Sequence, residues 1–383
     1  MAAGIMRTTL NVRAVTGRIP LGVAVDGPLA SRAAAELNVF GAPHAQQKRG
    51  VLTARFSGGR SSVSGIVATV FGSTGFLGRY VVNGLGRIGS QIVVTYRGDD
   101  ECIRHLKVMG DLGQIVPLPI DVRDPASLER AVSRSNVVIN LIGKDYETRN
   151  FNFDDVNVKT AKLIAEVSKS VGVERLIHVS ALAVGKDKLS RWAATKAAGE
   201  EVVREAFPGA TILRPGVLYG TEDQFLNRVA SFAKQMPRQL LIDGGRAKVQ
   251  PTYVGDVAVA ILNALSTPES VGKTYELAGP TIYKLRELYE FVFDEILEDD
   301  NTVDVSPAVA KLLGYILQQS PFTPLLTVDQ VKRQLVDVVR DPKALSFEDL
   351  AVDKQANFSQ VAGEYLRRYR KGGLFAKVAD QTF

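Results

Sequence analysis

The sequence of 383 residues has little of several residue types: one cysteine, three histidines and one tryptophan. Because Cys102 is the single thiol, an internal disulfide is excluded, which fits a reducing compartment. The histidines His44, His105 and His178 are scattered and form no HxxxH pair, so a metal site has no support. No apolar run approaches the ~18 residues that a membrane-spanning helix needs, so we expect no transmembrane helix.

Acidic residues are absent from residues 1–25, which contain Arg7, Arg13, Arg18 and several hydroxyl side chains. This composition is typical of a mitochondrial presequence, and we predict one over 1–25, with a disordered basic tail as the alternative. Residues 26–63 carry glycine, proline and a Lys-Arg pair, and we interpret them as an N-terminal extension.

A glycine-rich turn is the most informative feature that is present. The β-branched run 66–71 meets Gly72, Gly75 and Gly78 at three-residue spacing, and an apolar helical pattern follows. Such glycines let the backbone approach a pyrophosphate at the positive end of a helix. The strand and helix context favours a dinucleotide site over an ordinary strand-to-helix turn, which is the alternative.

Further strands and helices alternate along the first half of the chain. This alternation predicts an α/β fold of the Rossmann type, with a doubly wound parallel sheet covered by helices on both faces. Residues 121–122 and 140–143 fall at strand ends, where open α/β sheets bind ligands. The predicted strands are Gln91–Tyr96, Ile115–Ile120, Asn136–Ile142 and Arg175–Ser180, and the predicted helices are Ala126–Ser133 and Val158–Val171.

The residue after the second strand bears on the choice of nucleotide. Arg97 stands where NAD-binding sites usually place a carboxylate, and a guanidinium can bind a 2′-phosphate through two hydrogen bonds. We therefore predict NADPH as the cofactor. Asp99 and Asp100 keep NAD(H) as the less favoured alternative, and a solvated turn residue is the other interpretation of Arg97.

Catalytic residues are expected next, and one of them is missing. The order of strands and glycines resembles short-chain dehydrogenases, which pair a serine with a Tyr-x-x-x-Lys motif. Ser180 and Lys196 match the serine and the lysine, but Trp192 stands four residues before Lys196. An indole donates a hydrogen bond but does not titrate near neutral pH. We therefore predict a site that binds its cofactor without catalysis; a reductase or epimerase that uses Tyr219 or Tyr253 as its acid is the alternative.

Longer motifs resemble one family in particular. They are GGRSSVSG at 58–65, GFLGRYVVN at 75–83, MGDLGQ at 109–114, NVVINLIG at 136–143, NFNFDDV at 150–156, GEEVVR at 199–204 and QPTYVGD at 250–256. Together they closely resemble the large nucleotide-binding accessory subunits of mitochondrial respiratory complex I, over about residues 57 to 290. That family often keeps a tyrosine at the place of Trp192, so the replacement argues further against catalysis.

The resemblance implies an atypical short-chain dehydrogenase fold that holds NADPH for assembly or stability rather than turnover. It implies a peripheral location on the matrix side of the mitochondrial inner membrane, among other complex I subunits where the matrix and membrane arms meet. The implied cofactor-binding residues are Gly72, Ser73, Thr74, Gly75, Phe76 and Leu77 in the phosphate loop, Arg97 at the 2′-phosphate, Asp121 and Val122 at the adenine, Leu141, Ile142 and Gly143 at the ribose and pyrophosphate, and Lys196 with Pro215 near the nicotinamide.

The second half adds a small second lobe whose elements are interleaved with the nucleotide domain, which we place at 64–283. One predicted helix starts at Glu222, because Glu222 and Asp223 would place acidic residues in its first turn. We predict a strand that ends in a loop over Ala210–Gly220, further strands at Gln250–Tyr253 and Val271–Leu277, and helices at Glu222–Phe232 and Asp256–Ile261.

A C-terminal helical region is predicted over 284–383, and apolar faces dominate it. One face spans Leu285–Ile296 and another Val309–Leu317, and each must be covered by the protein's own core, by a partner subunit or by an anionic lipid surface. A third pattern runs over 328–339, and a basic, aromatic helix is predicted over Tyr365–Lys371. That helix and the net charge of +6 leave an RNA-associated scaffold as an alternative, but we expect no nucleic-acid partner.

Overall fold

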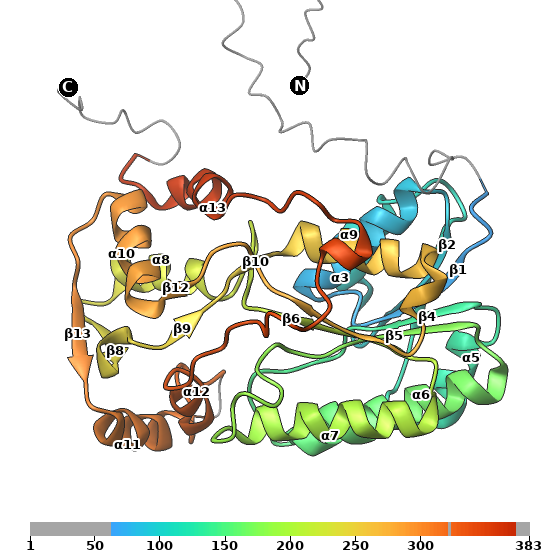
Figure 1. Cartoon of the computed structure of the whole chain (residues 1–383), viewed down its shortest axis with the longest axis horizontal. Coiled ribbons are helices and arrows are strands. Elements are labelled where there is room, and N and C mark those ends of the chain that lie inside the picture. Colours follow the sequence, from blue (N-terminus) through green and yellow to red (C-terminus); the bar gives the residue numbers. More distant parts are fainter. Residues whose placement is uncertain (1–62, 321–322, 373–383) are drawn as a thin grey trace, which may run out of the picture. The chain divides into compact units, whose positions relative to one another are not determined.

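A computed structural model describes residues 63–320 and 323–372, all within one compact unit of the chain (Figure 1). The predicted presequence at 1–25 and the extension at 26–63, apart from its last residue, lie outside the described residues. None of the helices in the described part combines the length and apolarity that crossing a membrane requires.

The centre of the fold is a parallel, seven-stranded sheet with strand order β11-β6-β5-β4-β1-β2-β3, which confirms the predicted α/β class. Its strands are β1 (Val67–Phe71), β2 (Gln91–Tyr96), β3 (Ile115–Pro119), β4 (Val137–Asn140), β5 (Arg175–Val179), β6 (Thr211–Pro215) and β11 (Thr274–Leu277). Because β1 pairs with β2 on one side and with β4 on the other, the winding reverses beside β1. Open sheets bind ligands at such a switch point, outside the carboxyl ends of the strands.

Helices cover both faces of this sheet, which explains why the central strands β1 and β4 are mostly apolar and almost fully buried. Val137 and Ile139 of β4 belong to one apolar cluster, whereas Val138 points the other way and belongs to a second cluster. Figure 1 shows the two helix layers on either side. Helices α3 (Phe76–Arg87) and α9 (Val254–Ser266) cover one face, and α5 (Pro125–Val132), α6 (Thr160–Val171) and α7 (Arg191–Ala206) cover the other.

Several element boundaries differ from the predictions. The helix predicted at Val158–Val171 is α6, and a π-helical turn, Asp155–Lys159, precedes it. The prediction of a basic helix at Tyr365–Lys371 is wrong. Helix α13 (Phe358–Leu366) ends at Leu366, and only a 3-10 turn, Arg367–Tyr369, follows.

The helix predicted at Glu222–Phe232 is also misplaced. The observed helix, α8 (Leu226–Gln235), starts four residues later and has no acid in its first turn. The reason is a side-chain network: the carboxylate of Asp223 accepts hydrogen bonds from the backbone N–H of Asn227 at 2.9 Å and from the hydroxyl of Tyr365. Residues before α8 therefore form a loop that is held by α13.

A smaller lobe has its own apolar core, built from segments far apart in the chain. Helices α8, α10 (Leu285–Ile296) and α13 supply this core. Short strand pairs accompany them: β7 (Leu218–Tyr219) with β10 (Thr252–Tyr253), β8 (Gln239–Ile242) with β13 (Thr302–Val305), and β9 (Lys248–Val249) with β12 (Tyr283–Lys284). Leu288, Val292 and Ile296 are at most 1% exposed, so the first predicted apolar face is covered by the protein itself.

The second predicted apolar face lies on α11 (Pro307–Leu317) and is not covered in this way. Ala310 and Gly314 pack inward, but Leu312 and Ile316 are 61% and 59% exposed. Helix α12 (Val328–Arg333) packs beside α11 and is the helical part of the pattern predicted over 328–339. Within the described part of the chain, α11 therefore presents uncovered apolar side chains.

Candidate functional site

A cleft of about 270 Å³ opens at the carboxyl ends of β1, β2, β3 and β4. The loops that follow these four strands supply its lining. Of the fourteen predicted cofactor-binding residues, eight line it: Gly72, Thr74, Gly75, Arg97, Val122, Leu141, Ile142 and Gly143. The phosphate loop, the end of β2 and the end of β4 thus meet around one cavity.

The turn between β1 and α3 forms one wall of this cleft. Gly72 has a φ of 80°, and a Cβ there would lie 3.0 Å from the carbonyl carbon of Leu141, so a side chain would be both strained and crowded. Helix α3 begins after Gly75, and no side chain caps its first backbone N–H groups. Those donors, at the positive end of the helix dipole, are available to a phosphate.

The other predicted loop residues support this turn rather than line the cleft. Ser73 is fully buried, and its hydroxyl donates to the carbonyl oxygen of Thr95 at 2.7 Å, which ties the loop to β2. Leu77 belongs to the apolar core, and the ring of Phe76 packs edge-on against Tyr80. These three residues position the phosphate loop without facing its cavity.

The ends of β2 and β3 form a second wall. Arg97 lines it, whereas Asp121 does not; one carboxylate oxygen of Asp121 accepts a hydrogen bond from the backbone N–H of Arg123 at 2.9 Å. The hydroxyl of Tyr96 donates to Asp100, so one of the two acids that favour NAD(H) is already engaged.

Part of the cleft lining escaped the sequence reasoning. The residues concerned are Thr95, Tyr96, Ile120, Lys144, Thr148, Phe151, Val156 and Thr160. Five of them follow β4, where the loop that leads to α6 runs beside the cavity. The motif at 150–156 marked this stretch, but nothing in the chemistry of a phenylalanine marks it as a residue of a nucleotide cleft.

Lys196 lies on α7 with its side chain buried beside the cleft. A Cβ on Gly143 would lie 3.1 Å from the Nζ of Lys196, and Nζ makes no hydrogen bond to another described residue. Burial lowers the pKa of Lys196 to about 8, although the carboxylates of Asp145 and Glu200 act in the opposite direction. Lys196 itself does not line the cleft, but its Nζ lies next to Gly143, which does.

Ser180, at the end of β5, is the second polar group in need of a partner. Its Oγ is buried and has no hydrogen-bond partner within the described residues. Burial lowers the pKa of the neighbouring His178 to about 3, so that ring is neutral, and it bonds the amide of Asn140 at 3.2 Å. Pro215, at the end of β6, is buried and does not line the cleft. Neither Lys196 nor Ser180 lines the cleft, so the groups that fit a dinucleotide there are the uncapped backbone N–H groups at the start of α3 and the guanidinium of Arg97.

Trp192 takes the place where a catalytic tyrosine is expected, and contacts on two sides fix it. Its Nε1 donates to the carbonyl oxygen of Lys144 at 2.9 Å. The guanidinium carbon of Arg333, from α12, lies 4.5 Å from the centre of the indole. Arg333 also donates to the carbonyl oxygen of Asp145 at 3.1 Å, so α12 packs over the indole beside the loop that lines the cleft.

Neither Tyr219 nor Tyr253, the alternative acids, lines the cleft. Their ring centres lie 5.7 Å apart, at the aromatic core of the smaller lobe. Burial raises the pKa of both hydroxyls, that of Tyr253 to about 12, so neither gives up a proton readily near neutral pH.

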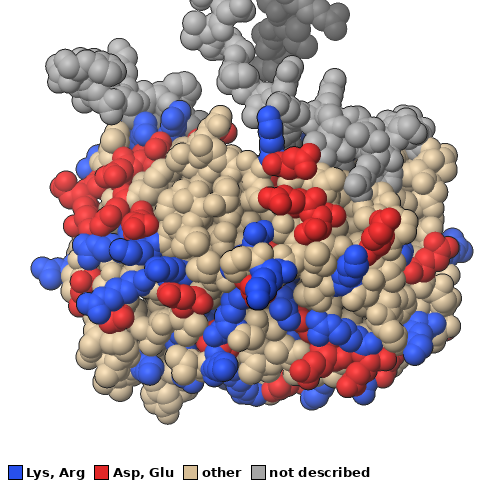
Figure 2. Space-filling view, viewed as in Figure 1, with Lys and Arg blue, Asp and Glu red and all other residues tan. Residues whose placement is uncertain are grey.

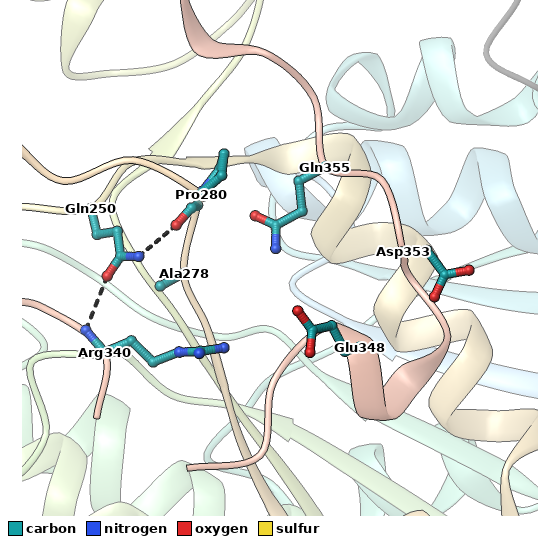
Figure 3. Close-up of a pocket in the computed structure, with 8 residues that line it drawn as sticks. Gln250, Ala278, Pro280, Arg340, Glu348, Asp353 and Gln355 are labelled. Atoms are coloured by element: carbon teal, nitrogen blue, oxygen red, sulfur yellow. Dashed lines mark hydrogen bonds between the residues drawn. The ribbon is translucent and has the colours of Figure 1, made fainter. Parts of the chain in front are cut away.

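A second pocket, polar and about 370 Å³ in volume, lies between the loop after β11 and residues 340–355 (Figure 3). Gln250 forms one side of it, donating to the carbonyl oxygen of Gly279 and accepting from the backbone N–H of Arg340 at 3.1 Å. None of the predicted cofactor-binding residues lines this pocket. Nor do the described residues include a group of three or more His, Cys, Asp or Glu side chains suited to a metal ion.

Comparison with known proteins agrees with this geometry. The model of the NAD dependent epimerase/dehydratase family matches residues 68–278. The NADH dehydrogenase [ubiquinone] 1 alpha subcomplex subunit 9, mitochondrial, of Arabidopsis thaliana is 45% identical over 334 residues, which are 85% of this chain and 83% of that protein. The subunit of the same name from Mus musculus is 43% identical over 91% of this chain and 92% of its own length.

A solved structure shows the same fold at much lower identity. It is a dTDP-glucose 4,6-dehydratase from Streptomyces venezuelae with NAD and TYD bound, 18% identical, with a TM-score of 0.61 over 79% of this chain and 97% of that one. The resemblance predicted from the motifs is thereby confirmed. The chain belongs to the NAD dependent epimerase/dehydratase family and, within it, to the subunit 9 branch of the mitochondrial NADH dehydrogenase alpha subcomplex.

Proposed function

We propose that this chain, an accessory subunit of mitochondrial NADH:ubiquinone oxidoreductase, holds NADPH as a structural ligand and turns over no substrate. The observation that carries the proposal is a cleft with a main-chain phosphate cradle next to a non-titrating indole, which is hydrogen-bonded to the lining residue Lys144 where a catalytic phenol is expected. NADPH would be held at the phosphate loop, at Arg97 and at Lys196.

The preference for NADPH over NAD(H) is supported by the charges at the end of β2. Arg97 lines the cleft there, and a guanidinium matches the geometry of a phosphate. Asp100 is held by Tyr96 and lies 3.9 Å from the Nζ of Lys107, which leaves Asp99 as the acid that favours NAD(H).

The absence of turnover is supported by the surroundings of Trp192. Bound NADPH supplies a hydride in active dehydrogenases, and a titrating group must then exchange a proton with the substrate oxygen. Here the indole N–H is committed to the carbonyl oxygen of Lys144, and Arg333 covers the ring. The position of the catalytic phenol is thus taken by an indole that cannot exchange a proton near neutral pH.

The RNA-associated alternative has less support. Arg367 and Arg370 lie 3.3 Å and 2.7 Å from the carboxylate of Glu295, and Arg368 donates to Asn227 at 2.6 Å. On the face drawn in Figure 2, Lys and Arg are interspersed with Asp and Glu. Nucleic-acid binding favours a continuous basic groove, so we expect no nucleic-acid partner.

The partners we propose are other complex I subunits where the matrix and membrane arms meet, on the matrix side of the inner membrane. The uncovered apolar side chains of α11, Leu312 and Ile316 among them, support a docking role, because monomeric proteins rarely expose such contiguous surface. Peripheral contact with anionic lipid is the second partner considered.

Two measurements test this function together. Mass spectrometry of native particles that contain the chain identifies both its neighbours and its bound nucleotide, and we expect complex I subunits and one NADPH. Incubation of the full chain with NADPH and a panel of carbonyl substrates should give no oxidation. Turnover that disappears in Lys196→Ala would establish an enzyme and overturn the proposal.

A further inference from the structure

One aromatic ring in the cleft carries two guanidinium groups. Phe151 lies in the loop after β4 and lines the cleft. The Cζ of Arg97, just after β2, lies 5.2 Å from the ring centre, and the Cζ of Arg123, shortly after β3, lies 4.1 Å from it. Segments that follow β2, β3 and β4 therefore meet at this ring.

Both guanidinium groups lack a carboxylate partner among the described residues. Arg123 donates to the carbonyl oxygen of Asn150, which holds it beside the ring. The pKa of Asp155 is lowered chiefly by the hydrogen bond from Lys159 at 2.7 Å and least by Arg123, so this carboxylate is paired with Lys159. Arg97 lines the cleft, and Arg123, which is exposed and not a lining residue, lies beside it at the ring of Phe151, so two unpaired positive charges meet at this ring.

This arrangement is informative about the ligand. Like charges on one ring repel each other, and cation–π attraction offsets only part of that cost. A group with two negative charges removes the repulsion, and a phosphate monoester carries nearly two at neutral pH. A ribose hydroxyl, which is what NADH presents at the same position, carries none.

We propose that Arg123 is a second specificity-determining residue of this cleft, which binds the 2′-phosphate of NADPH together with Arg97 while Phe151 holds both guanidinium planes in position. The inference rests on the proposed function, that the cleft holds NADPH, and adds to it a residue that the strand-end rule does not identify. Arg123 follows the third strand, whereas that rule looks at the end of the second.

The test compares two nucleotides on the full chain. Isothermal titration of Arg123→Gln with NADPH and with NADH should show NADPH binding weakened on the order of tenfold to a hundredfold, and NADH binding changed by less than about threefold. Arg134→Gln is the matched control, because Arg134 is exposed and precedes β4 at the opposite edge of the sheet. It should leave both affinities at wild-type values.

Two further variants separate charge from geometry. Arg123→Lys keeps the charge but loses the planar, forked donor, so we expect an intermediate loss of NADPH affinity. Phe151→Leu keeps an apolar side chain but removes the ring face, so we expect reduced discrimination between NADPH and NADH although both arginines remain. Thermal unfolding of each nucleotide-free variant near the wild-type temperature shows that the fold is intact.

The outcomes test the role of Arg123 separately from the proposed function, which is NADPH binding by the cleft. If the wild type prefers NADPH and Arg123→Gln keeps that preference, the assignment of Arg123 is overturned and the proposed function stands. An equal loss of NADPH and NADH affinity in Arg123→Gln also overturns the assignment. If the wild type binds neither nucleotide, or prefers NADH, the proposed function fails and the inference fails with it.

Discussion

Lys196 shows, at the scale of a residue, that a binding group can lower the stability of its own fold. It is 5% exposed, and burial lowers its pKa from 10.5 to about 8. The folded state therefore binds the proton less tightly than the unfolded state does. This destabilises the fold by about 3 kcal/mol below pH 8, and the penalty fades as the pH rises from 8 to 10.5.

We expect Lys196→Met to stabilise the nucleotide-free chain at pH 7 and to weaken NADPH binding by about tenfold or more. Methionine fills similar space without a buried charge. Urea unfolding at pH 7 and pH 10 measures the first effect, and titration with NADPH the second. Lys162→Met, on the exposed side of α6, is the control and should change neither. A less stable free chain at pH 7 would contradict this account of Lys196.

The pKa of Asp256, near the start of α9, is raised rather than lowered. Burial raises its pKa from 3.8 to about 6, although its carboxylate accepts a hydrogen bond from the backbone N–H of Ala356 at 2.8 Å. Because the folded pKa lies above the unfolded one, the stabilising contribution is complete below pH 3.8 and is lost as the pH rises through about 6.

Asp256→Asn should therefore raise the free energy of unfolding at pH 7.5 by up to about 3 kcal/mol, because the amide oxygen still accepts the same bond without a charge. Chemical unfolding between pH 4 and pH 8 should show a flatter profile for this variant than for the wild type. Asp294→Asn, at an exposed position of α10, should keep the wild-type profile. Parallel profiles for Asp256→Asn and the wild type would remove Asp256 as the cause.

At the scale of elements, α12 joins the C-terminal region to the helix that carries Trp192 and Lys196. The carboxylate of Asp329 accepts hydrogen bonds from the hydroxyl of Ser190 and the backbone N–H of Arg191, both at 2.8 Å. Arg333, one turn later, covers the indole. Two contacts of one short helix thus hold the first turn of α7.

The double variant Asp329→Asn with Arg333→Gln should release this helix. We expect amide hydrogen exchange of α12 and of the first turn of α7 to rise by about tenfold, which corresponds to roughly 1.4 kcal/mol, while β1 and β4 keep their protection. Exchange measured by mass spectrometry tests this. Lys332→Gln, on the same helix, should leave both segments unchanged. Faster exchange throughout the sheet would show general unfolding instead of local release.

The predictions that succeeded depended on local patterns. The glycine turn before α3, the alternating strands and the buried face of Leu285–Ile296 follow from residues that are neighbours in the chain or on one helix face. The start of α8 does not, because Asp223 is bonded to Tyr365, which lies 142 positions later. Local acid placement predicted a helix start that this long-range bond replaces with a loop.

The residues of the site likewise fall into those that local motifs predicted and those that they did not. Motif reasoning placed the phosphate loop and Arg97 at the cleft, since both positions follow from the ends of predicted strands. It did not place Phe151 between two arginines or Arg333 over Trp192, because these contacts join loops and helices that only the folded chain brings together.

At the scale of the whole molecule, the cleft lies at the switch point of the sheet, and the loop after β4 that lines it also contacts Trp192. A ligand that binds only the folded state stabilises it in proportion to the logarithm of its concentration over its dissociation constant. NADPH at about a thousand times that constant would contribute about 4 kcal/mol. We therefore expect a bound structural nucleotide to stabilise the subunit and to favour its entry into complex I.

Gly75→Asp tests this role. A carboxylate at the start of α3 would face the pyrophosphate, and its Cβ would lie 3.2 Å from the carbonyl oxygen of Gly72. We expect the variant to lose NADPH, to show no rise in unfolding temperature when NADPH is added, and to reach a lower level in assembled complex I. Gly209→Asp, between α7 and β6 and away from the cleft, should behave as wild type in all three measurements.

Quantitative mass spectrometry of complex I isolated from cells that express each variant alone gives the assembled level. Wild-type assembly of a Gly75→Asp subunit without bound nucleotide would show that complex I does not need NADPH here, and the cleft would then have to be explained as a relic of a catalytic ancestor.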